Sequence, residues 1–158
     1  MLTSVTRPLN RLADWTADLP LRAFLAWEFF ESGLEKLHGS NWFADVQSSF
    51  PWPFNVLPPE LNWQLSMWAE LICPILLMLG LGTRLASLTL MIVTVVAIAA
   101  VHWPEHWSTL AELAQGYSIS DQGFGNYKLP LIYIVALAPL LLKGAGRLSL
   151  DQLLRAKG

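Results

Sequence analysis

The chain has 158 residues, of which 54% are hydrophobic and 14% are charged, and its mean hydropathy is +0.43. An ordinary soluble domain is about a quarter charged, so this composition argues against a soluble enzyme and against a disordered tail. The net charge of -2 provides no basic surface for phosphate contacts, so we expect no nucleic-acid partner. The length fits one domain over residues 1–158. Cys73 is the only cysteine, which excludes an intrachain disulfide and a CxxC redox pair.

The order of apolar segments predicts an all-α integral membrane protein. Near the start, Leu9, Leu12, Ala13 and Thr16 recur at helical spacing and predict a short interfacial helix. A membrane helix needs about 20 mostly apolar residues, and the segments that meet this are approximately 19–37, 61–81, 84–102 and 126–143. The first of these is the weakest because charged residues interrupt it. We therefore expect an antiparallel four-helix transmembrane bundle that begins with an interfacial helix.

Basic residues are unevenly distributed between the predicted connections. They flank the first and last spans or lie between the second and third: Arg7, Arg11, Arg22, Arg84, Lys143, Arg147, Arg155 and Lys157. The other two connections hold only Lys36 and Lys128. By the positive-inside rule, both termini are expected in the cytoplasm, and the loops near 38–60 and 103–125 face outward. Tryptophans in these loops form either an interfacial belt or a cap over a site.

The first predicted span carries ionisable residues at membrane depth. Glu28, Glu31 and Glu35 lie within about 60° of arc on one helical face. Carboxylates this close in a dry environment cannot all ionise unless a cation or a metal joins them. Lys36 and Arg22 are candidate counter-ions. The alternative, which we favour for these residues, is that Glu35 and Lys36 lie in the outer interface and that Arg22 extends toward the inner membrane surface.

The second span places Glu70 midway, with Met67 and Cys73 three residues to either side on the same face. A carboxylate, a thioether and a thiol in one stripe are candidate copper ligands, and Met and Cys are also ordinary packing residues. Glu70 as a hydrogen-bonding or proton-handling group is the stronger interpretation.

The third and fourth spans add candidates that titrate or donate hydrogen bonds. His102 and His106 have metal-ligand spacing, but Pro104 is expected to separate them. His102 is instead a candidate partner for a carboxylate. Tyr133 offers a hydroxyl either to a quinone carbonyl or to a neighbouring backbone group.

Several motifs resemble the DoxX family of small four-helix inner-membrane proteins. They are Arg22, Phe29 or Phe30, Ser32-Gly33, Lys36-Leu37, Glu70, residues 80–84 (GLGTR) and residues 144–151 (GAGRLSLD). Segments 28–33 (EFFESG), 41–45 (NWFAD), 101–104 (VHWP) and 121–130 (DQGFGNYKLP) are similar to its HvfX branch. The resemblance implies a multi-pass protein of the bacterial inner membrane. The HvfX branch is associated with copper-binding modified peptides and their multinuclear iron oxidase, which are therefore the candidate partners.

The resemblance also implies quinone-coupled oxidation of sulfur compounds and thiol redox homeostasis. Without a CxxC pair, this chain could not act alone as a two-cysteine disulfide oxidoreductase. The leading hypothesis is a membrane subunit that assists maturation or export of copper-binding peptides and has a candidate role in a quinone-linked oxidoreductase. Its polar pocket for quinone or copper is expected to be built from Glu28, Glu31, Glu70 and His102. The alternative is a passive membrane scaffold for soluble partners. A small transporter or metal channel ranks below both hypotheses, because the sequence shows no broken-helix symmetry between its halves. A second copy of the chain is a further candidate partner.

Overall fold

The computed structural model describes residues 9–10, 12–104, 106–116 and 125–156. Regular structure within these ranges is helical, which confirms the all-α prediction for the described part of the chain. Arg7, Arg11, Lys157 and positions 121–124 of the fourth HvfX-like segment lie outside the described residues.

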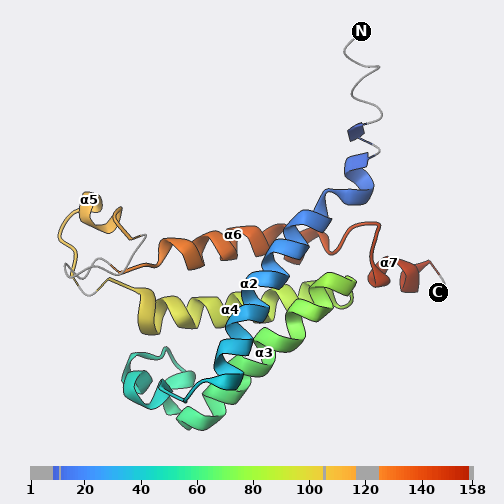
Figure 1. Cartoon of the computed structure of the whole chain (residues 1–158). Helices are drawn as coiled ribbons and strands as arrows, with labels where there is room; N and C mark the ends of the chain where they lie inside the picture. Colours follow the sequence, from blue (N-terminus) through green and yellow to red (C-terminus); the bar gives the residue numbers. More distant parts are fainter. Residues whose placement is uncertain (1–8, 11, 105, 117–124, 157–158) are drawn as a thin grey trace.

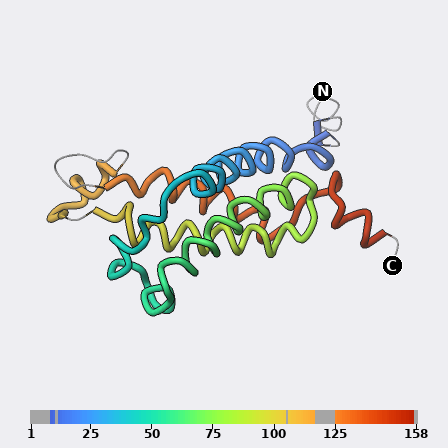
Figure 2. Tube along the Cα trace, turned by 60° about the horizontal axis from the view of Figure 1, so that its bottom comes forward, coloured from blue at the N-terminus to red at the C-terminus, as the bar shows by residue number. Residues whose placement is uncertain are grey.

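The long helices form two packed pairs that cross each other (Figure 1). Helix α2 (Asp18–His38) packs along α3 (Pro59–Leu79), while α4 (Thr83–Ala97) packs along α6 (Lys128–Lys143). The α3–α4 contact joins the pairs, whereas α2 and α6 touch over a smaller area. Helix α2 is therefore held in the bundle mainly by α3. Figure 2 shows the same helices from a second direction.

The helix boundaries follow local sequence chemistry. Pro58 occupies the N-cap position of α3, and Pro59 is its first residue. Proline suits this position because N–H groups in the first helical turn have no carbonyl partner within the helix, so the missing N–H costs no hydrogen bond. Gly80 ends it with φ 65°, a left-handed conformation that favours glycine. Helix α4 continues through a π-helical turn, η3 (Ile98–His102), and Pro104 follows that turn.

The short connections and the long loops lie at opposite ends of the bundle (Figures 1 and 2). One end carries the 80–82 connection, the helical residues 12–16 and α7 (Leu150–Arg155). The other end carries η1 (Phe43–Ser49), η2 (Phe54–Val56) and α5 (Leu110–Leu113). The long helices α2, α3, α4 and α6 therefore run back and forth between these two ends.

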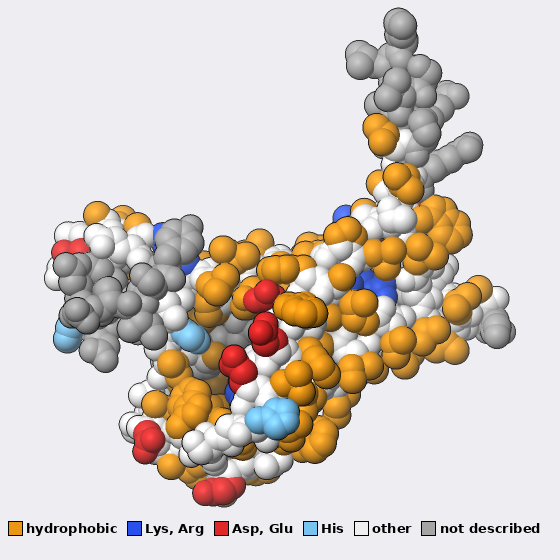
Figure 3. Space-filling view, viewed as in Figure 1, with side chains coloured by type: hydrophobic (Ala, Val, Ile, Leu, Met, Phe, Trp, Pro, Cys, Tyr) orange, Lys and Arg blue, Asp and Glu red, His pale blue; other side chains and the backbone are white. Residues whose placement is uncertain are grey.

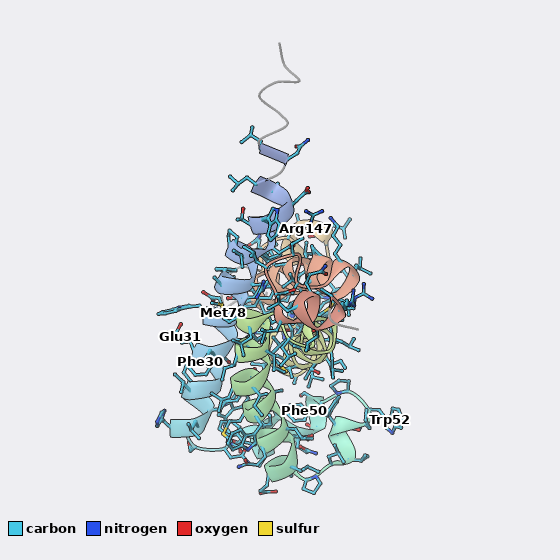
Figure 4. All side chains as sticks on the ribbon, turned by 90° about the vertical axis from the view of Figure 1, so that its right-hand side faces the viewer. Phe30, Glu31, Phe50, Trp52, Met78 and Arg147 are labelled. Carbon is cyan, nitrogen blue, oxygen red and sulfur yellow. The ribbon has the colours of Figure 1, made fainter. Side chains whose placement is uncertain are left out.

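The loop between α2 and α3 is an ordered aromatic cap. The ring of Phe43 packs edge-on against Phe50 and Trp63, at centroid distances of 5.1 and 5.0 Å. Gln47 Nε2 donates to the carbonyl oxygens of Asn55 and Leu57, at 2.9 and 2.6 Å, which holds the loop closed on itself. Figure 4 shows Trp52 extending away from this cap, and its side chain is 80% exposed.

Among the described helices, the segment Thr83–His102 is long and apolar enough to cross a membrane by length and composition. Helix α2 interrupts its apolar surface with acids, and α6 has 16 residues, about 24 Å, against a hydrocarbon core of about 30 Å. The helix expected from residue 126 begins at Lys128. Helix length and composition thus support one membrane span among the described residues, and the four-span bundle stays a prediction.

The apolar core lies where the two helix pairs meet. Its buried members come from all four long helices and are Leu25, Phe29, Cys73, Leu77, Ala86, Leu90, Leu137 and Leu140. Tyr133 packs against this cluster while its hydroxyl extends to a polar partner. The core therefore borders directly on the candidate site.

Candidate functional site

Glu70 lies at the closest approach of α2 and α3. A Cβ atom on Gly33 would lie 2.9 Å from the backbone carbonyl carbon and oxygen of Glu70, so only glycine permits this spacing. Lys36 Nζ is 2.6 Å from Glu70 Oε2, and Ser32 Oγ donates to the same oxygen at 3.4 Å. The Glu70 side chain is only 6% exposed. Its carboxylate is thus neutralised by a cation delivered from the neighbouring helix.

Glu28 connects α2 to α6 through a second polar contact. The Tyr133 hydroxyl donates to Glu28 Oε2. The Tyr133 ring lies between Phe24 and Phe29, with centroids at 6.2 and 5.6 Å. The contact gives the partly buried Glu28 carboxylate a hydrogen-bond donor from the neighbouring helix.

Glu31 and Glu35 are exposed on α2. Figure 3 shows a line of acidic side chains along this helix, and Figure 4 places Glu31 on its outer face. Lys36, the expected counter-ion of these acids, pairs with Glu70 instead. The acidic face of α2 is therefore open toward the surroundings of the bundle.

His102 pairs with an amide rather than with a carboxylate. Its Nδ1 lies within hydrogen-bond distance of Asn126 Oδ1, and the Asn126 N–H donates to the His102 carbonyl at 3.2 Å. These contacts tie η3 to the start of α6. Pro104 follows the helix end as expected, and His106 is exposed beyond it.

The candidate metal ligands do not form a cluster. Within the described residues, no group of three His, Cys, Asp or Glu side chains gathers around one point. Cys73 is part of the apolar core, and Met67 is 4% exposed. Copper ligation by Met67, Cys73, His102 and His106 stays a prediction.

Arg22 occupies a position that the sequence did not reveal. Its side chain is 2% exposed and donates to the carbonyl oxygens of Leu77 at 2.7 Å, Met78 at 2.5 Å and Leu148 at 2.8 Å. A further bond of 3.1 Å reaches the Ala145 carbonyl. The guanidinium satisfies carbonyls at the C-terminal end of α3 and binds them to the chain after α6.

Asp151 completes this arrangement from the C-terminal side. It accepts hydrogen bonds from the N–H groups of Gly82 at 2.8 Å and Thr83 at 3.1 Å, and its own N–H donates to the Gly80 carbonyl at 2.9 Å. Partial burial alone would raise the pKa of Asp151, but these backbone hydrogen bonds hold it below its ordinary value. A Cβ on Gly80 would lie 2.5 Å from Ser149 Cβ.

We name the assembly of Arg22 with segments 80–83 and 144–151 the clasp. It gathers most of the residues that resemble the DoxX motifs and gives them a structural role. Local sequence could not reveal the clasp, because Arg22 and Leu148 are 126 positions apart. The sequence feature that could have indicated the clasp is the pair of glycines at the ends of each of the segments 80–82 and 144–146.

Residues 17–103, which include α2, α3 and α4, match the DoxX family. The chain therefore belongs to the DoxX family of membrane proteins, and its place is the lipid bilayer. An uncharacterized protein of Haemophilus influenzae is 50% identical over 137 residues, which cover 87% of this chain and 82% of that protein. No solved structure matches the chain.

Proposed function

We propose that α2, α3, α4 with η3, and α6 all cross the bacterial inner membrane, with both ends of the chain in the cytoplasm. The outward surfaces support this, because Trp27, Leu85 and Val135 are 71%, 70% and 66% exposed on three different helices. Exposed large side chains of this kind are suited to contact with lipid. The basic residues Arg84, Lys143 and Arg147 lie near the end that we place in the cytoplasm.

We further propose that the acidic face of α2 and Tyr133 form an intramembrane pocket for a quinone headgroup. An acid at membrane depth costs about 2.5 to 3.5 kcal/mol on insertion scales, so the exposed Glu31 needs a polar partner rather than lipid tails. The contact between Tyr133 and Glu28 carries this proposal, because it joins a proton donor and acceptor beside two phenylalanine rings.

These residues suit the chemistry of the headgroup. A bound quinone would supply two-electron redox chemistry coupled to proton uptake. Tyr133 has a single O–H, so it would turn this donor from Glu28 Oε2 to a quinone carbonyl, and Glu28 would then hold a proton at the vacated Oε2 atom. Phe24, which is 47% exposed, provides flat apolar surface for the ring, and buried Phe29 packs against Tyr133 from the core. We propose copper only as the alternative ligand, because Met67 and Cys73 are buried and His102 already pairs with Asn126.

The wider role that we propose is a membrane subunit for maturation or export of copper-binding modified peptides. The HvfX-like segments support it, and two of them, 28–33 and 101–104, contain Glu28 and His102. The partners would then be such a peptide and its multinuclear iron oxidase, and this chain would act as the membrane part of a quinone-linked oxidoreductase.

Quinone extraction and metal analysis of the protein purified in mild detergent test the pocket. We expect the wild type to retain quinone, and Glu28→Gln and Tyr133→Phe to lose most of it. Glu60→Gln, which removes an exposed acid at the start of α3, is the matched control and should retain it. Absence of quinone from the wild type, or equal retention by all variants, would reject the pocket. Copper that disappears with Glu70→Gln would favour the metal instead.

A cellular experiment separates the pocket from a passive scaffold. The pocket predicts that Glu28→Gln and Tyr133→Phe impair copper tolerance and peptide maturation. The scaffold predicts that these variants are silent and that removal of residues 1–18 or 147–158 is damaging. Protein levels in the membrane fraction must be matched, because truncation after residue 146 also removes Asp151 from the clasp.

A further inference from the structure

A cavity of about 500 Å³ lies beside the clasp, where α4 begins and α7 follows the end of α6. Basic side chains dominate the charge of its lining. The ionisable lining residues are Arg84, Lys143, Arg147, Arg155, Asp14 and Asp151. With four cations and two carboxylates, the lining carries a formal charge of +2.

The charge of Asp151 interacts with Arg155, while Arg84, Lys143 and Arg147 are available to a ligand. Both Asp151 oxygens accept backbone N–H groups, from Gly82 and Thr83, so this carboxylate already has strong partners. Within the described residues, the structure contains no ion pair at this end of the bundle, because its salt bridge joins Lys36 to Glu70. Arg84 uses one nitrogen, Nη2, on the Leu142 carbonyl at 3.0 Å, and the rest of its guanidinium has capacity for another acceptor.

The surroundings of the cavity suit the boundary between lipid and water. The Arg147 guanidinium lies 5.7 Å from the centre of the Trp15 ring, and this ring is 49% exposed. Tryptophan favours the headgroup level of a bilayer. Leu85 lines the cavity and is 70% exposed, so apolar surface adjoins the basic residues. A ligand here can place a charged group among the cations and an apolar part along α4.

We propose that this cavity binds a phosphate group, and that an anionic phospholipid headgroup supplies it. Arg84 and Arg147 would bind phosphate oxygens through paired N–H donors, and Lys143 would add a point charge. The phosphate would sit against the clasp and hold α7 at the membrane surface. This site is independent of the polar face of α2, so it stands whatever binds there.

Native mass spectrometry of the full-length protein in detergent tests the site with two probes. Phosphatidylglycerol is compared with phosphatidylcholine, which carries a phosphate but no net charge, and inorganic phosphate is added as a competitor. We expect wild-type protein to favour phosphatidylglycerol, and Arg84→Gln and Lys143→Gln each to weaken its binding about fivefold. Lys128→Gln, a charge removal at the other end of the bundle, is the matched control and should change the affinity little.

The outcomes separate the sources of phosphate. Persistence of the lipid adduct in millimolar inorganic phosphate identifies the lipid as the ligand, whereas displacement identifies a free phosphate site with the same residues. Arg84→Lys should bind more tightly than Arg84→Gln, because it keeps the positive charge at the same position but loses the paired donors, and this comparison separates lost charge from lost packing. Equal weakening in Lys128→Gln, or no weakening in Arg84→Gln and Lys143→Gln, would overturn the proposal.

Discussion

The side chains of Lys36 and Glu70 form a buried charge pair that crosses between two helices. Two long side chains are held in one geometry here, and Ser32 Oγ accepts a further bond from Lys36 Nζ at 3.1 Å. The desolvation of both charges opposes the Coulomb attraction, so the pair as a whole contributes little net stability. Its importance is that neither partner tolerates loss of the other.

A double-mutant cycle measures this dependence. Lys36→Met leaves the Glu70 carboxylate buried without its cation, and we expect it to lower the free energy of unfolding by about 3–5 kcal/mol. The double variant Lys36→Met/Glu70→Met should recover much of that loss, because no uncompensated charge remains. Thermal unfolding in detergent provides the measurement, with exposed Glu60→Gln at the start of α3 as the control. Purely additive effects of the two changes would show that the pair is not coupled.

Asp151 makes the clasp sensitive to acid. Its pKa is lowered in the folded protein relative to the ordinary aspartate value of roughly 3.9, because its carboxylate accepts two backbone N–H groups. A group of this kind stabilises the fold above the unfolded-state pKa, and the contribution is lost as the pH falls through the folded-state pKa.

We therefore expect Asp151→Asn to be less stable than the wild type at pH 7, by about 1 kcal/mol, because the amide loses the charge and replaces one of the two acceptor oxygens with a donor. The difference should shrink below about pH 4, where protonation removes the advantage of the wild type. Unfolding midpoints of both proteins between pH 7 and pH 3 give the measurement. A difference that stays constant over that range would show that the carboxylate charge is irrelevant to the clasp.

At the scale of the helices, the α2–α3 contact depends on the absence of a side chain at Gly33. Even one methyl group there would meet the Glu70 backbone at 2.9 Å, and backbone cannot move aside as a flexible side chain can. Small residues allow close helix approach in membrane proteins, and here the approach also sets the reach of Lys36 to Glu70.

Gly33→Ala should consequently separate the helices and destabilise the protein by about 1–3 kcal/mol, as overpacking does. It should also reduce the coupling between Lys36 and Glu70 when the double-mutant cycle is repeated in that background. Ser32→Ala is a suitable control, because position 32 already carries a Cβ and the change removes only the hydroxyl and its hydrogen bonds to Glu70 and Lys36. Unchanged stability and coupling in Gly33→Ala would mean that α2 shifts without consequence.

The helices themselves were predictable because their signals are local. Apolar runs, the prolines at 58 and 59, and the glycines at 80 and 144 lie inside or next to the helices that they define. Spacing on α2 also predicted the line of Glu28, Glu31 and Glu35. The partner of each acid was not predictable, because the choice between Lys36 and Arg22 depends on how α3 and the chain after α6 pack against α2.

At the scale of the whole molecule, the clasp joins the beginning of α2, the α3–α4 connection and the chain after α6. It closes the bundle at one end, while the aromatic cap around Phe43 and Trp63 lies at the other. The asymmetry gives the molecule two chemically different ends. One is basic, with Arg84, Lys143 and Arg147, and the other is aromatic and rich in proline.

This asymmetry predicts the orientation in the membrane. By the positive-inside rule, the clasp end faces the cytoplasm and the aromatic cap faces outward. Single cysteines test this in a Cys73→Ala background, which removes the buried native thiol. Ser108→Cys, before α5, should react with a membrane-impermeant maleimide in intact cells. Gln152→Cys, in α7, should react only after permeabilisation. The reverse pattern would invert the orientation, and labelling of both from one side would contradict helices that cross between the two ends.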